Sequence, residues 1–474
     1  MVDRRILAAA LAVGLAMGFH GVAHQEWGGD TERYIAVADN LLFNRCISID
    51  DPIAATCTPH WGGNQFPGYS AVIALVGAMI GRVPGDGNAA LQIAAIITQT
   101  SLLALVLVRV GSVVERTVQS PRWAAIAVLM LGFNPITFAW SRFILTETLA
   151  VATTIWLLAE LAESARIRCL RAVPLGLALA AAMFVRLDAV TLAPAVAVTA
   201  FMVHPPADAI RRGLLVAVIA SLPLGAWTAR NLAVGLSALP KSDYNVGLGK
   251  PQGLLDWLTT WTYRQYDGAT VIDAIANRRF DRVRFPNHAY RDAGEREQVA
   301  TLLARLNAHR GTEFPDDIDA EFSKLAEARR AADPVEYWLI LPLRRVATLW
   351  LLPTWSGGYP IEFHNPERER LRLEGWRDLV ALLADHPLPT VWRGALFGLR
   401  LALVVSTLFL LWRWPYQVPV ARVMLASTAA YAVVRSIFLA ELGFDEPRLM
   451  IEAYAALWLA TLMACLLRSR AVPT

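Results

Sequence analysis

Long apolar runs alternate with short polar connections along most of this chain. A helix of about 20 apolar residues crosses the hydrocarbon core of a bilayer. We interpret ten runs as membrane spans, at 6–22, 89–110, 123–140, 148–161, 172–185, 189–203, 213–229, 391–411, 419–439 and 449–467. The pattern therefore predicts an all-α polytopic membrane protein with about ten transmembrane helices.

Two further apolar stretches, 67–80 and 337–353, do not fit this scheme as spans. The first is short, and the second carries Arg344 and Arg345 at its centre. We expect both to be helices that lie in or near the outer interface, where Arg side chains can snorkel to the lipid headgroups. If either one spans the membrane, every later loop changes side.

The start of the chain has two interpretations. Arg4 and Arg5 followed by an apolar run resemble the start of a cleaved signal peptide. Because many more spans follow, we prefer a retained signal anchor.

Two polar stretches interrupt the spans. The first, 23–88, contains a helical pattern that begins at Asp30 and continues through Tyr34, Ala38, Leu41 and Leu42. The second, 231–390, holds amphipathic patterns at 293–308 and 317–332, and it either covers or binds a substrate or serves as a structural cap. We therefore expect a catalytic membrane module at 1–230, an outer insert at 231–390 and C-terminal spans at 391–474.

Charge gives the orientation. The chain is 55% hydrophobic and 18% charged, and its net charge of +4 is too small and too dispersed to indicate a nucleic-acid partner. With the N-terminus in the cytoplasm, every predicted inner loop is basic, as short cytoplasmic loops are. Those loops carry Arg109, Arg116 and Arg122; Arg166, Arg168 and Arg171; Arg211 and Arg212; Arg413 and Arg422; and Arg468 and Arg470. The pattern predicts a multi-pass protein of the cytoplasmic (inner) membrane with both termini cytoplasmic.

The four cysteines divide between the two sides. Cys46 and Cys57 fall in the first outer loop, whereas Cys169 and Cys465 fall at or near the inner side. A disulfide between Cys46 and Cys57 suits an oxidising compartment, and two unpaired thiols are the alternative.

Acidic and basic residues mix at the predicted outer mouth, whereas the inner charges are nearly all Arg. For any single residue a helix cap or a snorkelling contact is the simpler explanation. As a set, the mixture suits a site that holds an anionic group beside a carboxylate base. The residues are Asp30, Arg142, Glu147, Arg186, Asp188, Arg230, Asn231, Arg435, Glu441, Glu446 and Arg448.

Several short motifs in this order resemble the C-type (GT-C) membrane glycosyltransferases. The similarity is to bacterial relatives of the protein O-mannosyltransferases, the aminoarabinose transferase of lipid A and the lipid A galacturonosyltransferases. It covers roughly the first half of the chain and returns at the last outer turn. The motifs are Gly29-Asp30 with Tyr34, Phe66-Pro67-Gly68-Tyr69, Leu145-Thr146-Glu147, Arg186-Leu187-Asp188, Trp227-Thr228-Ala229-Arg230-Asn231 and Glu446-Pro447-Arg448.

The resemblance implies transfer of a sugar from a polyprenyl-phosphate carrier to a lipid, glycan or protein acceptor on the outer face. It assigns Asp30 as the base or acceptor-orienting carboxylate and Glu147 as the second acidic position. Tyr34, Arg142, Arg186, Asp188, Arg230 and Arg448 are the expected substrate- and phosphate-binding residues. Two features depart from the family: Asp30 has no second acid beside it, and Gln65-Phe66 stands where many relatives place a basic residue.

The chemistry agrees with these residue types. A polyprenyl phosphate is a good leaving group, so the reaction needs one carboxylate near the acceptor hydroxyl. It also needs fixed cations for the phosphate charge, a task for which the planar Arg side chain is suited. Some relatives use a divalent cation beside the first-loop acid, but His24, His60 and His364 lack ligand spacing, and we assign no metal ligand.

Two alternatives remain. A transporter or lipid flippase would place charges near the bilayer midplane and show an internal repeat; we find few mid-span charges and no convincing repeat. An inactive scaffold built on the same fold is the second, against which the retained Asp30 and outer arginines argue.

Overall fold

The computed structural model describes most of the chain. It covers 2–26, 30–53, 57–60, 66–238, 251–263, 271, 283, 285–309, 314–351, 376–413, 418–441 and 447–471, with the backbone alone at 376, 378, 447, 448 and 469–471. These residues are almost entirely helical. The β-pairing found among them is one isolated bridge between Glu26 and Phe143. The predicted all-α membrane architecture is confirmed.

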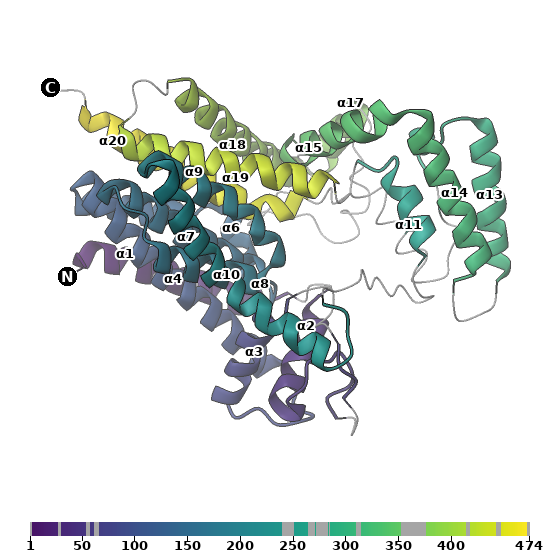
Figure 1. The fold of residues 1–474 in the computed structure, drawn as a ribbon, viewed down its shortest axis with the longest axis horizontal. Helices are drawn as coiled ribbons and strands as arrows, with labels where there is room; N and C mark the ends of the chain where they lie inside the picture. Colours follow the sequence, from purple (N-terminus) through teal and green to yellow (C-terminus); the bar gives the residue numbers. More distant parts are fainter. Residues whose placement is uncertain are drawn as a thin grey trace. The chain divides into compact units, whose positions relative to one another are not determined.

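The chain forms two compact units (Figure 1). Unit 1 comprises Met1–Pro240, Pro353–Arg435 and Ile451–Thr474, and unit 2 comprises Lys241–Leu352 and Ser436–Met450. Near the two ends of the predicted insert, 231–390, α10 continues to Ala233 and α17 packs against the span α18.

Unit 1 is a bundle in which α1 packs on α4 and α5, α4 on α7, α7 on α8 and α20, and α8 on α10. Its elements are α1 (Arg4–Ala23), α2 (Thr31–Asp39), the π-helix η1 (Asn40–Asn44), α3 (Gly68–Met79), α4 (Ala89–Val118), α5 (Pro121–Gly132), α6 (Pro135–Phe138), η2 (Ala139–Arg142), α7 (Glu147–Ile167), α8 (Ala172–Val185), η3 (Leu187–Leu192), α9 (Ala193–Val203), α10 (Pro206–Ala233), α17 (Trp376–Asp385), α18 (Pro387–Trp412), α19 (Pro419–Glu441), whose last residues belong to unit 2, and α20 (Ile451–Ala471).

Each of the ten predicted spans coincides with helical structure, but fewer than ten helices are long enough to cross alone. Among the described residues, seven helices have the length and apolarity of a span: α1, α4, α7, α10, α18, α19 and α20. The segment 121–142 makes an eighth if its 47° bend lies within one span. That bend follows from Pro135, which lacks an amide proton, and from Asn134, whose side chain accepts from Ile136 N at 3.0 Å. The remaining two, α8 and α9, are 14 and 11 residues long.

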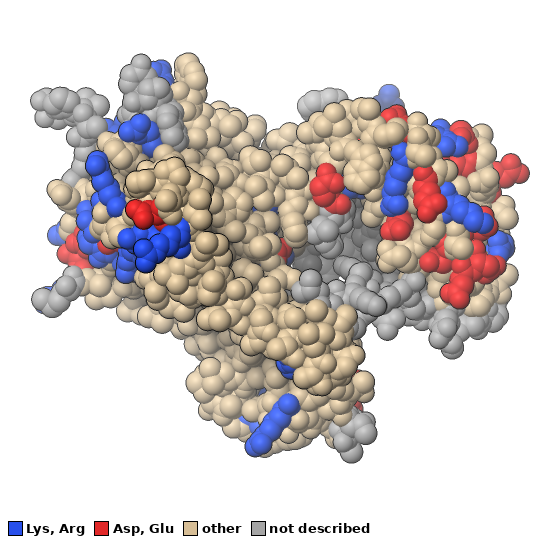
Figure 2. All heavy atoms as spheres, in the orientation of Figure 1, with Lys and Arg blue, Asp and Glu red and all other residues tan. Residues whose placement is uncertain are grey.

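Both termini of unit 1 lie at one end of its bundle, at the left of Figure 1. Lys and Arg gather on the same end in Figure 2, whereas the flank of the bundle is almost free of charge on the face shown. This arrangement agrees with an even number of crossings and with the basic loops that we assign to the cytoplasm. The assignment of that end to the cytoplasm stays a prediction.

The first outer loop contains the expected short helices. α2 and η1 follow Asp30, and α3 corresponds to the predicted interfacial helix at 67–80. α3 begins against the last turn of α8 with no room for a side chain, because a Cβ at Gly68 would lie 1.9 Å from the carbonyl oxygen of Phe184. Close backbone contact therefore fixes the start of α3 on α8.

Unit 2 is a small helical domain with its own core. Its elements are α11 (Gln252–Thr259), η5 (Asn287–Ala289), α13 (Ala293–Ala308), α14 (Asp316–Ala332), the π-helix η6 (Glu336–Ile340), α15 (Leu341–Leu351) and η9 (Pro447–Met450). Trp257, Trp261 and Phe322 are buried at the centre of this core. Buried Glu295 is satisfied by Trp257 Nε1 at 2.8 Å and Arg329 Nη1 at 3.0 Å. The predicted amphipathic helices at 293–308 and 317–332 are confirmed as α13 and α14.

The prediction that Arg345 snorkels to the interface is wrong. Arg345 is buried and donates to the carbonyl oxygens of Thr262 at 2.9 Å, Ala440 at 2.8 Å and Thr259. A helix whose two faces both carry apolar residues can bury either one, and here the face with Leu341 and Leu349 faces inward. Arg344 remains exposed and pairs with Glu336 at 2.6 Å.

Candidate functional site

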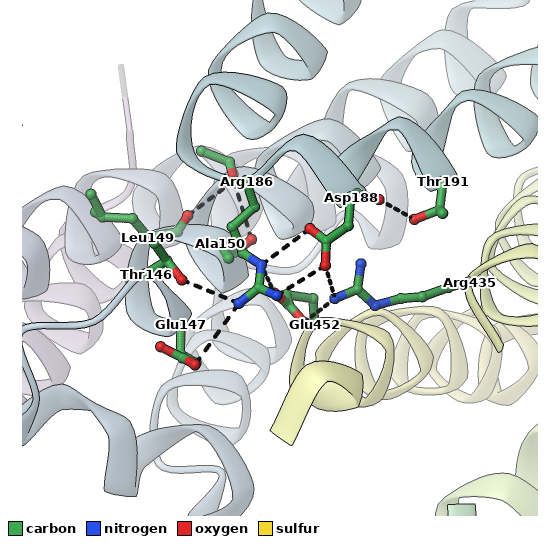
Figure 3. Close-up of polar contacts among 10 residues, drawn as sticks. Thr146, Glu147, Leu149, Ala150, Arg186, Asp188, Thr191, Arg435 and Glu452 are labelled. Atoms are coloured by element: carbon green, nitrogen blue, oxygen red, sulfur yellow. Dashed lines mark hydrogen bonds and ion pairs between the residues drawn. The ribbon is translucent and has the colours of Figure 1, made fainter. Parts of the chain in front are cut away.

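An ionic cluster lies where α7, α8, α19 and α20 meet in unit 1 (Figure 3). Glu147 is the first residue of α7, Arg186 follows α8, and Asp188 lies in η3. Arg435 lies on α19, and Glu452 lies in the first turn of α20. Four of these side chains therefore project from a helix end or the turn beside it, whereas Arg435 lies inside the span α19, six residues before its end.

Arg186 is the centre of this cluster. Its Nε and Nη2 donate to the two carboxylate oxygens of Asp188 at 3.1 and 2.9 Å, and its Nη1 donates to Thr146 Oγ1 at 3.1 Å. The carboxylates of Glu147 and Glu452 lie 3.8 and 3.6 Å from the same guanidinium. The bidentate geometry fixes the orientation of the Arg186 plane and so sets the direction from which Glu147 is held.

Arg435 completes the cluster from α19. Its Nη2 donates to Glu452 at 2.9 Å and to Asp188 at 3.3 Å. Arg435 and Glu452 are only 1% and 2% exposed, and Glu147 is 3% exposed. Burial of a charge is costly unless it is paired, and these five side chains contain three carboxylates and two guanidiniums. The pairing explains their burial and leaves the group rich in acid.

Tyr34 links this cluster to the loop that carries Asp30. Its ring is buried and meets the edge of Tyr69 with centroids 4.9 Å apart. Burial raises the pKa of the Tyr34 phenol well above its usual value, and the nearby carboxylates of Glu147 and Asp30 raise it further, while a hydrogen bond with Thr146 opposes them. The phenol is therefore neutral and lies near both predicted catalytic acids.

Asp30 itself lies at the start of α2, where its carbonyl oxygen accepts from Tyr34 N at 3.1 Å. The next residue, Thr31, donates its hydroxyl to the carbonyl oxygen of Ile144 at 3.2 Å, in the turn just before α7. This bond joins the two acidic loops directly. The structure thus brings Asp30, Tyr34, Glu147, Arg186 and Asp188 into one region.

Two further arginines that we expect to bind phosphate, Arg142 and Arg230, contact protein groups in the same way as Arg186. Arg142 is buried, with Nη1 3.4 Å from Glu26 Oε1 and its guanidinium 5.0 Å from the Phe143 ring. Arg230 donates to the carbonyl oxygens of His60 at 2.7 Å and Ile47 at 3.2 Å. Those carbonyls flank the predicted disulfide, which is present between Cys46 and Cys57 with their Cα atoms 6.5 Å apart. Arg230 therefore anchors this disulfide loop.

Some predicted residues lie outside the described part of the chain. These are Gly29, Gln65 and Glu446, the side chain of Arg448, and His364. Among the described residues no group of three or more His, Cys, Asp or Glu side chains has the arrangement of a metal site. The absence of an assigned metal ligand thus stays a prediction for the chain as a whole.

Sequence reasoning missed Glu452 and placed Arg435 only at the edge of the site. Glu452 had a signal, because a carboxylate one turn inside a predicted span needs a partner. The statement that inner charges are nearly all Arg is also wrong. Glu160 pairs with Arg109 at 2.7 Å and Arg171 at 2.6 Å, and Glu163 pairs with Arg166 at 2.9 Å.

Comparison with known proteins gives one structural likeness to report. The chain is similar to the crystal structure of ArnT from Cupriavidus metallidurans bound to undecaprenyl phosphate, with 15% identity, 94% of this chain and 76% of that chain covered, and a TM-score of 0.33. No family model matches the chain, and no curated protein matches it.

Proposed function

We propose that this protein is a membrane glycosyltransferase of the GT-C type. It moves a hexose or pentose from a polyprenyl-phosphate carrier to a lipid, glycan or protein acceptor at the outer face of the inner membrane, with inversion at the anomeric carbon. The order of the short motifs along the sequence supports the family. The observation that carries the proposal is the joining of the Asp30 loop to the buried acid-rich cluster of Glu147 through Thr31 and Tyr34.

In this proposal Asp30 accepts or orients the proton of the acceptor hydroxyl. It is half-buried at the start of α2, beside the exposed residues Glu32 and Arg33. General-base assistance of this kind requires hydrogen-bond reach, about 3 Å between heavy atoms. Glu147 is the second acid, and Arg186 and Asp188 keep it in place.

The phosphate of the carrier needs fixed cations. Arg142, Arg186 and Arg230 already bind Glu26, Asp188 and backbone carbonyls respectively. Phosphate binding by any of these arginines therefore requires an exchange of partners when the carrier enters. Arg448 keeps the role that the sequence gave it.

Replacement of Asp30 by Asn tests the base assignment. We expect Asp30→Asn to abolish transfer, because an amide cannot accept the proton, while expression and membrane insertion stay unchanged. The matched control is Glu32→Gln, an exposed carboxylate in the first turn of the same helix. Mass spectrometry of envelope glycolipids and glycoproteins from cells with each variant gives the readout. Substantial product with Asp30→Asn would remove the assignment.

Glu147 provides the second test. Glu147→Gln keeps the shape of the side chain and removes the charge that faces Arg186 and Tyr34, so we expect transfer to fall strongly while the protein still folds. Parent-like product from this variant would show that the buried cluster is structural.

One observation favours the transporter alternative. Arg400 lies at the centre of the span α18, is buried, and places its guanidinium 5.7 Å from the Tyr454 ring. The sequence alone did not single out this mid-span charge. If the protein moves lipid phosphates across the bilayer, proteoliposomes should translocate a labelled polyprenyl phosphate without any acceptor, and Arg400→Leu should stop it. A glycosyltransferase shows no such movement.

A further inference from the structure

The helix that runs from 335 to 351 in unit 2 has two apolar faces, of which only one is packed. Its inner face buries Leu341 and Leu349. The opposite face exposes a stripe in which each residue follows the last by four positions: Val335, Leu339, Leu343, Ala347 and Leu351. Trp338, beside the stripe, is 62% exposed, and Leu339 and Leu343 are 55% and 56% exposed. Single exposed apolar residues are ordinary, but a continuous stripe indicates an interaction surface.

Hydrogen bonds tie this helix to the end of a membrane span. Trp350 Nε1 donates to Ser436 Oγ at 2.8 Å, and Arg345 Nη1 donates to the carbonyl oxygen of Ala440 at 2.8 Å. Both acceptors lie in the last two turns of α19, which has the length and apolarity of a span. Between them on α19, Ile437 is 53% exposed. The apolar stripe thus lies beside the exposed apolar residues at the end of α19, Val433 and Ile437.

The polar groups beside the stripe suit a lipid headgroup layer. Exposed Arg344 is 6.0 Å from the Tyr263 ring, and Arg330 is 5.2 Å from the Tyr337 ring. Tyr and Trp are enriched at membrane interfaces, and Arg snorkels from there to phosphate. The remaining charges of unit 2 gather over α13 and α14 in Figure 2. The 335–351 helix therefore differs from α13 and α14 in that its exposed face is apolar.

We propose that the exposed face of the 335–351 helix lies in the bilayer interface and binds lipid. Val335, Leu339, Leu343 and Leu351 enter the acyl boundary, and Arg344 reaches the phosphates. The helix is about 24 Å long at 1.5 Å per residue. It anchors unit 2 to the membrane independently of any catalytic role for the protein.

Lipid-depth fluorescence of the full-length protein in phosphatidylcholine and phosphatidylglycerol nanodiscs tests this proposal. Cys169→Ser and Cys465→Ser remove the two free thiols among the described residues and leave the disulfide intact. Leu339→Cys and, separately, Leu343→Cys then receive an environment-sensitive label. Lys324→Cys on α14, where the side chain is 69% exposed, is the matched control.

We expect labels at 339 and 343 to be quenched more by doxyl lipids than by aqueous iodide, at a depth of about 5–10 Å below the headgroup boundary. The label at 324 should show the reverse order. Iodide quenching at 339 and 343 equal to that at 324 would place the face in water and overturn the proposal. Protection from both quenchers would overturn it as well, because a protein segment would then cover the stripe.

Discussion

The two ends of α7 carry ionic clusters of opposite character. At its N-terminal end, Glu147 joins a group with more carboxylates than guanidiniums, and Arg435 and Glu452 in that group are almost fully buried. At its other end, Glu160 and Glu163 meet four arginines, whose side chains are 27–39% exposed. One helix thus ends in a dry, acid-rich site and in a wet, basic one.

The difference separates two tasks that a charged residue can perform in a membrane protein. Basic residues near water fix the orientation of the chain, and their carboxylate partners neutralise part of the charge within the bundle. Buried acid-rich groups have no such use and are costly, so they indicate a site. Burial and sign together, rather than the number of charges, distinguish the candidate site from the orienting end.

The largest effect should come from removing Arg435. In Arg435→Ala, Arg186 remains alone with the buried carboxylates of Glu147 and Glu452 and the partly buried Asp188, and we expect a loss of about 3–5 kcal/mol in stability. Thermal unfolding of the purified protein in detergent measures it. The double variant Arg435→Met with Glu452→Leu should recover much of the loss, since it removes one charge of each sign.

A matched change at the other end should cost much less. In Arg171→Ala, Glu160 keeps both of its bonds to Arg109, at 2.7 and 3.0 Å, and solvent reaches the site. We expect a loss below about 1 kcal/mol in the same unfolding assay. If Arg171→Ala and Arg435→Ala cost the same, the two ends do not differ as we describe.

Salt should give the smallest effect and the sharpest contrast. At about 1 M salt the Debye length falls to about 3 Å, which screens exposed pairs far more than buried ones. The loss in stability of Arg171→Ala relative to the parent should shrink when salt is added. The loss in stability of Arg435→Ala should not change. A salt response of equal size in both variants would contradict the burial argument.

The sequence alone predicted the local features well. The helices at 293–308 and 172–185 were predicted with the bounds that the structure has. The proximity of Arg186 to Asp188 follows from two positions of separation, and that of Cys46 to Cys57 from a short loop. Apolar periodicity and short spacing carry this information directly.

Long-range partners were beyond the sequence. Arg230 binds carbonyls 170 and 183 positions earlier in the chain, and no side-chain pattern marks a backbone oxygen as a ligand. Which face of the helix with Arg345 is buried depended on which side of that helix met Thr262 and Ala440. The start and end of unit 2 depended on packing between helices, such as α17 on α18. In each case tertiary contacts decided between alternatives that the local sequence pattern could not distinguish.

The close approach at Gly68 limits how this protein can vary. Because the Cβ of any other residue would meet the backbone of Phe184, a substitution must move α3 away from α8, the helix that Arg186 follows. Gly213 and Gly225 on α10 have open space around them and can change freely. In a library of variants selected for function, position 68 should therefore remain glycine while the lipid-facing glycines drift. Gly68 thereby sets the distance between the start of α3, in the first outer loop, and the end of α8, beside the buried acids.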